Sequence, residues 1–456
     1  MVYSVILKSQ LEGALRMDAE YYQLEYLDDV EKIKSFSNGF KAIGSSNLKV
    51  VSGPFGSSLK SSAYLESGVP FLRISDLRDF FINKTELVYI SEEDNLRLKQ
   101  SQLFSNDIVL SKVGNTIGIL SKVPQEFKVC NISENNIGIK FKDSNFSKEY
   151  KDYLLVFFNS KFGFDQIFRR ISGNAQPKLN IQDVYNIIYP LASEEFSGQI
   201  SNLVTESEVL INEGNKFYSQ AENLLLEEVG LRDFINNENL FGIVNLSEIK
   251  KVNRIDAEYF LSDFTRLVKK IKTEKLGSLV AIKKGIEPGS EAYQDVGKLF
   301  MRVSSLTKEG IIDKDQKYLS DGLYQKLKED FQPNIGEILL TKDATPGIAY
   351  ALKEPIEGII SGGILRLSIK ENVSAEYLAF CINSIIGKSQ VDRDAGGSII
   401  KHWRPEQIKS MQIPILPVEI QQKIADLTKK SHEARKKAKE LLEEAKNKVE
   451  KLIESK

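Results

Sequence analysis

Basic and small polar side chains gather in glycine- and serine-rich loops of this chain and at the ends of strand-like segments. Lysine and arginine bind phosphate, and arginine, lysine, glutamine and serine also read base edges, so these residue types fit contact with DNA. The candidate DNA-binding residues are Ser57, Ser58, Lys60, Arg73, Lys112, Gln176, Lys178, Lys283, Lys284, Arg302, Lys342, Lys401 and Arg404. Lys112 and Lys342 recur at matched positions of an internal repeat, whereas exposed lysines elsewhere commonly contact nothing specific.

Motifs that would make the chain an enzyme acting on DNA are absent from the sequence. A methyltransferase acting alone needs a glycine-rich cofactor loop and an Asn/Asp-Pro-Pro-aromatic motif, and the sequence has neither. It has no phosphate-binding Gly-x-x-x-x-Gly-Lys-Ser/Thr loop either. Asp107 followed by Glu126 and Lys128 has the residue types of a metal-dependent nuclease core, but the second half of the chain has no equivalent Glu-x-Lys. We therefore predict a non-enzyme with no catalytic residue.

Composition also limits metal and cofactor chemistry. His402 and His432 are the only histidines, and Cys130 and Cys381 the only cysteines, too few for a His-based cluster or a thiolate metal site. So few cysteines suit a reducing cytoplasm. We predict no metal site, no cofactor bound by this chain, and a cytoplasmic location.

Charge and hydrophobicity indicate an ordinary globular protein of several domains. The 456 residues carry a net charge of −1, whereas a protein that coats nucleic acid without sequence preference is usually basic. Positive charge for DNA must therefore be local, or a partner must supply part of the phosphate contact. No apolar run approaches the roughly 20 residues that span a bilayer, and no signal peptide is visible, so we expect no membrane partner.

Several short patterns occur twice in the same order, which indicates a duplicated unit. The pairs are residues 16–22 with 254–260, 71–77 with 300–306, 107–112 with 337–342, and 153–166 with 377–390. The first pair predicts the start of a short helix and the last pair a longer helix. Alternation predicts strands for the two middle pairs, with Arg73 and Arg302 on a polar strand face.

The loops of the two copies differ more than the framework does. Residues 173–178 correspond to residues 397–402, and there the flanking residues agree while the middle ones do not. A scaffold that is used twice with different loops predicts recognition of two related but different targets.

Each copy ends in a long helix with a heptad pattern of apolar or small residues, and the two patterns are 224 residues apart. The predicted heptad line contains Ile420, Ile424, Leu427, Ser431, Ala434, Ala438, Leu441, Ala445 and Leu452 in one helix, and Phe196, Ile200, Leu203, Ser207, Leu210, Gly214, Phe217, Ala221 and Glu228 in the other. Small residues on this line let two helices approach closely, so each helix is the simplest partner for the other.

These patterns predict an α/β (α+β) fold with two tandem-repeat globular domains joined by two long antiparallel helices that form a coiled coil. The predicted borders are 1–192 for globular domain 1, 193–232 for the central helix, 233–416 for globular domain 2 and 417–456 for the C-terminal helix. A parallel pair would need a long return path, which is why the antiparallel arrangement is preferred.

This arrangement resembles the specificity subunit of Type I restriction-modification enzymes over essentially the whole chain. The resemblance rests on the duplication, on the Arg-x-Asp-Ala-Glu-Tyr patterns at Arg16 and Arg254, and on the Asp/Glu-Ile-x-Leu-x-Lys strands. It also rests on residues 414–422, which read Pro-Ile-Leu-Pro-Val-Glu-Ile-Gln-Gln. The first-copy equivalent of that entry, residues 190–196, lacks the second proline.

The resemblance implies that the two globular domains are target recognition domains 1 and 2 of a DNA-binding, non-catalytic subunit for DNA methylation and phage defence, and that each reads one half of a bipartite double-stranded DNA site. It implies that the helices dock two methyltransferase (modification) subunits, which carry S-adenosylmethionine. In the family, restriction/translocase subunits can join the same complex.

Two other functions fit the same residues: the specificity chain of a two-headed Type II restriction-modification system, and a non-DNA coiled-coil adaptor. Trp403, the only tryptophan, either stacks on DNA or packs in the core at the position of Leu179, and packing is preferred. The Lys/Glu run from Arg435 to Lys456 is interpreted as the solvated face of the last helix rather than a DNA-binding arm.

Overall fold

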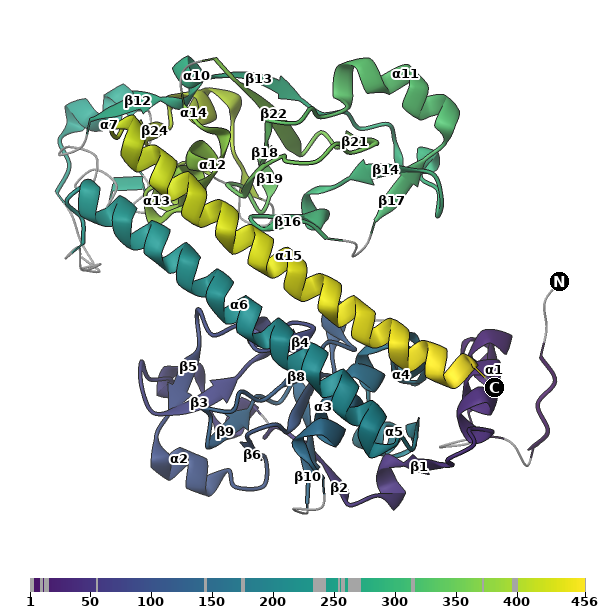
Figure 1. Cartoon of the computed structure of the whole chain (residues 1–456). Helices are drawn as coiled ribbons and strands as arrows, with labels where there is room; N and C mark the ends of the chain where they lie inside the picture. The colour runs from purple at the N-terminus through teal and green to yellow at the C-terminus, as the bar shows by residue number, and fades with distance from the viewer. Residues whose placement is uncertain are drawn as a thin grey trace. The chain divides into compact units, whose positions relative to one another are not determined.

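The computed structural model divides the chain into two compact units. It describes residues 4–8, 11, 16–54, 56–142, 146–173, 177–232, 243–252, 255, 259–260, 272–312, 316–370, 373–395 and 401–455. Unit 1 comprises Met1–Leu210 and Lys437–Lys456, and unit 2 comprises Ile211–Lys436. The long helices α6 (Glu194–Glu228) and α15 (Val418–Glu454) each contribute residues to both units (Figure 1). Among the described residues, no helix is both long and apolar enough to cross a membrane.

Unit 1 combines short helices with two mixed sheets. Its helices are α1 (Leu24–Lys34), α2 (Glu92–Arg97), α3 (Lys148–Asn159), α4 (Lys161–Phe168) and α5 (Ile181–Tyr185). Its strands are β1 (Phe40–Ala42), β2 (Leu48–Ser52), β3 (Val69–Leu72), β4 (Phe80–Phe81), β5 (Val88–Ile90), β6 (Leu103–Phe104), β7 (Ile108–Ser111), β8 (Leu120–Lys122), β9 (Val129–Ile132), β10 (Asn136–Phe141) and β11 (Ile188–Pro190). The sheets have the strand orders β2-β10-β7-β8-β4 and β5-β3-β9-β6, and β1 pairs with β11.

Unit 2 repeats this plan. Its helices are α7 (Leu246–Val252), α10 (Leu276–Leu279), α11 (Asp321–Phe331), α12 (Ala375–Asn383), α13 (Ile385–Asp394) and α14 (Pro405–Ser410). Its strands are β12 (Thr273–Lys275), β13 (Val280–Lys284), β14 (Lys298–Met301), β15 (Leu306–Thr307), β16 (Gly310–Ile311), β17 (Lys317–Leu319), β18 (Ile338–Thr341), β19 (Asp343–Ala344), β20 (Ala349–Ala351), β21 (Gly358–Ile360), β22 (Ile364–Ile369), β23 (Lys401–His402) and β24 (Gln412–Pro414). The order β13-β22-β18-β20 corresponds to β2-β10-β7-β8 of unit 1, and the order β17-β14-β21 corresponds to β5-β3-β9.

The repeat extends to strand register. Ser52 at the end of β2 pairs with Ile137 of β10, and Lys284 at the end of β13 pairs with Leu365 of β22. The predicted mixed fold, the duplicated unit and the two long helices are therefore confirmed.

The prediction of a strand through residues 71–77 and 300–306 is wrong in its second half. β3 ends at Leu72 and β14 at Met301, and a 3-10 turn follows each strand. The reason is a side-chain cap: the carboxylate of Asp76 accepts the N–H of Arg73 at 2.7 Å, and the Ser305 hydroxyl accepts the N–H of Arg302 at 3.1 Å. Arg73 and Arg302 therefore precede turns and share no strand face.

The helix predicted for residues 153–166 and 377–390 is broken once in each copy. α3 and α4 meet at Ser160, and α12 and α13 meet at Ser384, both with extended backbone. The corner is tight, because a Cβ on Gly163 would lie 2.3 Å from the carbonyl oxygen of Phe157. A Cβ on Gly387 would meet an equally close carbonyl, so only glycine fits at either corner.

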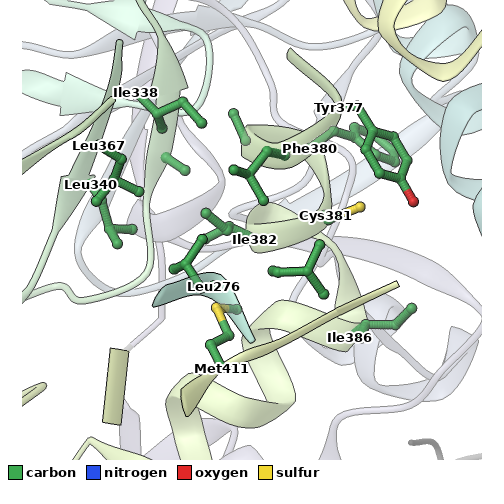
Figure 2. Close-up of a cluster of buried hydrophobic side chains, with 14 of the residues drawn as sticks. Leu276, Ile338, Leu340, Leu367, Tyr377, Phe380, Cys381, Ile382, Ile386 and Met411 are labelled. Atoms are coloured by element: carbon green, nitrogen blue, oxygen red, sulfur yellow. The ribbon is translucent and has the colours of Figure 1, made fainter. Parts of the chain in front are cut away.

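Each unit has its own core, built around the first helix of this pair. In unit 2, α12 presents Tyr377, Phe380 and Ile382 to a cluster that includes Leu340 of β18 (Figure 2). In both units a buried tyrosine ties this helix to the entry of the next long helix. The hydroxyl of Tyr153 donates to the carbonyl of Pro190 at 2.8 Å, and that of Tyr377 to Pro414 at 2.9 Å.

The buried line on the two long helices follows one pattern, 224 residues apart. The matched buried pairs are Ser197/Gln421, Ile200/Ile424, Ser201/Ala425, Val204/Thr428, Ser207/Ser431, Gly214/Ala438, Tyr218/Leu442, Ala221/Ala445, Leu225/Val449 and Val229/Ile453. The predicted heptad line is correct at one position per heptad. At the other it chose half-buried neighbours such as Leu441 instead of the buried Leu442.

The paired helix segments run antiparallel inside each unit. In unit 2, the Ser431 hydroxyl donates to the carbonyl of Gly214 at 2.7 Å, and Ala221 and Leu225 share a core with Ile424. A Cβ on Gly214 would lie 3.1 Å from the Ser431 carbonyl oxygen, so the small residue permits this close approach. The Lys/Glu run of α15 is helical, which agrees with its interpretation as a solvated helix face.

A buried charged network joins α6 to the sheet of unit 1. The Lys122 ammonium lies 3.2 Å from a carboxylate oxygen of Asp152 and 2.9 Å from one of Glu208. The Ser201 hydroxyl donates to the other oxygen of Asp152 at 2.8 Å. Burial alone would lower the pKa of Lys122, but the two carboxylates outweigh it and the pKa is raised.

Unit 2 has different chemistry at the same places. The repeat puts Ala351, Glu376 and His432 where unit 1 has Lys122, Asp152 and Glu208. Burial and the charges of Lys353 and Arg435 lower the pKa of His432 to about 4, so this imidazole is neutral near pH 7. Only unit 1 therefore carries a charged joint at this position.

Candidate nucleic-acid interface

Lys112 of unit 1 stands where three chain segments meet. It directly follows β7, and its N–H donates to the carbonyl of Asn135, in the turn before β10, at 3.0 Å. Its own carbonyl accepts the N–H of Leu179 at 3.0 Å, just after the variable loop. The backbone of Lys112 is thus fixed from both sides.

Lys342 of unit 2 has the same backbone partners. Its N–H donates to the carbonyl of Gly363 at 2.9 Å, and its carbonyl accepts the N–H of Trp403 at 2.9 Å. Trp403 and Leu179 are both buried, so Trp403 is a packing residue, as preferred from the sequence. The repeat therefore puts a lysine at one backbone position in each unit.

Glycine loops lie against the same turns. Gly53 donates its N–H to the carbonyl of Asn136 at 3.2 Å, and Gly285 donates to Ile364 at 3.1 Å. A Cβ on Gly53 would lie only 1.9 Å from a carbonyl oxygen of the facing turn, and one on Gly285 only 2.2 Å, so glycine is needed at both positions.

The side chain of Lys112 is half-buried and faces a neutral group. Its ammonium donates to the hydroxyl of Ser52 at 2.7 Å. Burial lowers the pKa of Lys112; the charge of Glu134 acts against this shift and that of Lys178 adds to it. Among the described residues, no carboxylate forms an ion pair with Lys112, so its charge is available to phosphate.

The side chain of Lys342 is paired instead. Its ammonium forms an ion pair with Asp343, and the other carboxylate oxygen of Asp343 lies 2.8 Å from Nδ1 of His402. Burial acts to raise the pKa of Asp343, but the hydrogen bonds from Lys342 and His402 outweigh it and lower the pKa. The carboxylate is therefore ionised and offsets the charge of Lys342.

Lys178 borders the variable loop of unit 1. Its N–H donates to the carbonyl of Ser172 at 2.8 Å and its carbonyl accepts the N–H of Ser172 at 2.9 Å, so these residues close the loop. Lys178 also bridges to Val113. In unit 2 the pair equivalent to Lys178 and Val113 is His402 and Asp343, which face each other on β23 and β19. Lys178 is exposed, and its charge acts on Lys112.

The structure places the other candidates as follows. Lys283 and Lys284 are exposed at the end of β13, and Lys60 is exposed before a 3-10 turn, with half-buried Ser58 two residues earlier. Arg404 is exposed and caps α14, its N–H donating to the side chain of Gln407 at 3.0 Å. Gln176 lies outside the described residues, as do the side chains of Ser57 and Lys401.

Arg73 is a structural residue more than a free cation. Its guanidinium donates to Asp76 at 3.1 Å and to the carbonyl of Glu86 at 2.6 Å. The hydrogen bond with Asp76 outweighs burial and raises the pKa of Arg73. Arg302 has no such carboxylate among its described contacts, so the equivalent arginines differ as the equivalent lysines do.

The acidic residue before each lysine-bearing strand holds backbone. Asp107 accepts the N–H groups of Phe104 at 2.8 Å and Phe141 at 3.1 Å, and burial raises its pKa. Glu126, the other nuclease candidate, forms an ion pair with Lys84 on the surface. Among the described residues, no group of three His, Cys, Asp or Glu is placed to hold a metal.

Sequence reasoning missed two carboxylates beside the glycine loops. Glu134 accepts the N–H of Gly56 in unit 1, while Glu287 accepts the N–H of Gly362 at 2.8 Å in unit 2. In unit 1 the carboxylate belongs to the turn, and in unit 2 it belongs to the loop. Because the two sides exchange roles, matching the repeats gives no signal for this joint.

Comparison with known proteins gives one family and several relatives. Residues 268–447 match the model of the Type I restriction modification DNA specificity domain. Over 396 residues the chain is 24% identical to the putative type I restriction enzyme MjaX specificity subunit of Methanocaldococcus jannaschii, covering 85% of this chain and 86% of that protein. Over 146 residues it is 26% identical to the type I restriction enzyme EcoBI specificity subunit of Escherichia coli, covering 31% of this chain and 29% of that protein.

A comparison with solved structures also gave matches. The S subunit of a Type-I restriction-modification system from M. genitalium aligns over 92% of this chain and 98% of that chain, with 12% sequence identity and a TM-score of 0.42.

Two α/β units repeat one backbone arrangement, each with a lysine between a glycine loop and a variable loop. Residues 268–447 match the Type I restriction modification DNA specificity domain, and the chain is similar to a type I specificity subunit over most of its length; these similarities support a DNA-recognition subunit.

Proposed function

We propose that the chain directs partner methyltransferase subunits to a bipartite double-stranded DNA site, with each unit reading one half. The observation that supports this most directly is the duplicated frame around Lys112 and Lys342. Backbone partners are the same in both units while neighbouring side chains differ, as expected if one scaffold reads two different sequences.

The proposal includes a division of labour. The chain contributes sequence recognition and no catalysis, in line with a family that is generally non-catalytic. The methyl donor, S-adenosylmethionine, is held by the methyltransferase subunits, and two of these bind each chain. Restriction/translocase subunits join the same assembly when DNA is cleaved.

The DNA-contacting surface in this proposal centres on Lys112 and Lys178 in unit 1 and on Lys283, Lys284 and Arg404 in unit 2. These residues are exposed or half-buried, and none has a carboxylate ion pair within the described part of the chain. Phosphate contact by such residues gives affinity that falls with salt, while base contacts from the loops give sequence preference.

The test compares the purified chain with the reconstituted complex. Mapping modified bases in the source genome identifies the candidate site. Duplexes with that site, with either half substituted, or with random sequence are then titrated with the chain plus its methyltransferase partner. We expect preference for the intact site, and no methyl transfer by the chain alone. Methylation by the rigorously purified chain would refute the division of labour, and equal binding of all duplexes by the complex would favour the adaptor.

A further inference from the structure

Arg16 reaches across the chain to the stem of the variable loop of unit 1. Its guanidinium donates to the backbone carbonyls of Arg170 at 3.1 Å and Ile171 at 3.3 Å. The same guanidinium binds the carboxylate of Asp18, with 2.8 Å between Nε and Oδ1. It also lies 4.7 Å from the ring centre of Tyr21. These contacts link residues more than 150 positions apart.

The clamped carbonyls lead directly to the lysines of the candidate interface. Ser172 follows Ile171 and forms the pair of backbone hydrogen bonds with Lys178, and the next residue, Leu179, donates to the carbonyl of Lys112. Arg16 is therefore connected to both lysines by a short series of backbone hydrogen bonds. The chain ends of the variable loop cannot shift without breaking one of them.

The geometry suits a fixed clamp better than a loose surface contact. Arg16 is half-buried, and the hydrogen bond with Asp18 outweighs burial and raises its pKa, so the guanidinium stays charged. Arginine makes several planar hydrogen bonds at once, whereas lysine is a point charge that cannot span a carboxylate and two carbonyls. Substitution of Arg16 by lysine therefore keeps the charge and removes the geometry.

We propose that Arg16 and Asp18 are positioning residues for DNA recognition by unit 1, because they hold the stem of the variable loop and thereby set the places of Lys178 and Lys112. This inference rests on the proposed function. It assigns a role to the Arg-x-Asp pattern that opens the chain, which motif matching alone does not provide.

Part of the arrangement recurs in unit 2. Arg169 lies 4.1 Å from the ring centre of Tyr21, and Arg393 lies 5.2 Å from that of Tyr259. Arg393 and Arg169 occupy equivalent positions, as do the two tyrosines. The counterparts of the clamp itself, Arg254 and Asp256, lie outside the described residues, so the proposal concerns unit 1.

The experiment uses the full chain with Arg16→Lys, and Asp18→Asn as a second variant that leaves the arginine in place. Arg97→Lys is the matched control, because Arg97 also pairs with an aspartate, Asp94 at 2.5 Å, but lies on α2 and contacts no loop stem. Amide hydrogen exchange of Ser172 and Lys178 is measured on the chain without DNA. Binding of half-substituted duplexes is measured on the complex with its methyltransferase partner.

We expect exchange at Ser172 and Lys178 to be about tenfold faster in Arg16→Lys than in the control. Discrimination at one half-site should fall about tenfold, at the half-site that Lys178→Ala affects, while the other half-site keeps its discrimination. The control should change neither quantity.

Three results would overturn the inference: unchanged exchange at these amides, faster exchange without any loss of discrimination, or equal loss at both half-sites. Faster exchange throughout unit 1 in both variants would also overturn it, because that outcome marks a residue of general stability. If the wild-type complex shows no sequence preference, the proposed function fails, and the exchange measurement still decides whether the clamp exists.

Discussion

Lys112 of unit 1 and Lys342 of unit 2 have equivalent backbone hydrogen bonds but different side-chain partners. The N–H of each lysine donates to the turn before β10 or β22, and the carbonyl of each accepts the N–H of the residue after the variable loop. Lys112 faces a serine hydroxyl and lies beside a second lysine, whereas Lys342 faces a carboxylate shared with a histidine. The difference arises at three pairs of matched positions: Val113 and Asp343, Lys178 and His402, and Ser52 and Lys284.

This comparison separates the parts of the repeat that carry the fold from the side chains that differ between the units. Backbone hydrogen bonds, the buried glycine corners and the tyrosine ties are the same in both units, because any change there would leave buried polar groups unpaired or create clashes. Side chains that point away from the core are free to differ. These side-chain differences change the local charge without altering the frame.

The largest difference between the units should appear in stability. Asp152→Ala leaves the buried Lys122 with only one carboxylate, so we expect unit 1 to lose about 3–5 kcal/mol. Glu376→Ala at the matched position of unit 2 is the control and should cost less than about 1 kcal/mol, because Glu376 acts on half-buried Lys353 only through its charge and forms no ion pair with a buried lysine among the described residues. Denaturant unfolding combined with hydrogen exchange resolves the two units. Equal losses would mean that the charged network around Lys122 contributes no more to stability than the matched residues of unit 2.

The lysines themselves should differ in DNA binding. Lys112→Ala should weaken binding by the assembled complex about tenfold and lower the salt slope by about one, as for a lost phosphate contact. Lys342→Ala should cost less than about threefold, because Asp343 already offsets its charge. Titrations at several salt concentrations measure both quantities. If the two variants lose the same affinity, the pairing seen in unit 2 does not matter for DNA.

Exchanging the neighbours should exchange the behaviour. Val113→Asp gives unit 1 the carboxylate of unit 2 and should weaken its half-site by roughly threefold to tenfold. Asp343→Val releases Lys342 and should strengthen binding by a few fold. The two variants control each other in the same titration. Changes of the same sign in both would contradict an electrostatic cause.

The smallest effect concerns pH. Phosphate binds the charged form of Lys112, and burial lowers the pKa of this lysine, so its contribution should be complete below the lowered pKa and lost as pH rises through it. DNA binding by the wild-type complex should therefore begin to weaken at a lower pH than it would if Lys112 had the pKa of an ordinary lysine. Lys112→Ala should remove this early decline. A decline that persists in the variant would have another origin.

The sequence predicted the frame well where local pattern and tertiary structure agree. The strands before Lys112 and Lys342 and the helices at Tyr153 and Tyr377 lie where expected, because alternation and helical spacing there match burial. The break at Ser160 was missed, since nothing in the apolar pattern marks a corner that depends on the close approach at Gly163. The turn at Arg73 was missed because a side-chain cap from Asp76 replaces the next strand hydrogen bonds.

The buried line of residues on the two long helices shows a different limit of prediction from sequence. A strict heptad count led to Leu441, whereas the helix buries Leu442. Each helix packs against a recognition domain as well as against its partner, so its buried stripe is wider than a two-helix contact and drifts from a period of 3.5.

The candidate site was predictable only in part. Repeat matching correctly identified Lys112 and Lys342 as equivalent positions, because their neighbours in sequence recur. The partners that set their charge were not visible in the same way. Glu134 and Gly56 are 78 residues apart, and the corresponding pair in unit 2 is reversed. Their roles in DNA contact stay predictions.

The division of the chain has a consequence for synthesis on the ribosome. Unit 2 is one continuous segment, but unit 1 needs Leu442, Ala445, Val449 and Ile453 to complete its core. Those residues emerge about 230 residues after Leu210, which at about 5–20 residues per second is a delay of roughly 10–50 s. During that interval Ile200 and Val204 lack the helix that covers them. The unit translated first is thus the last to be completed.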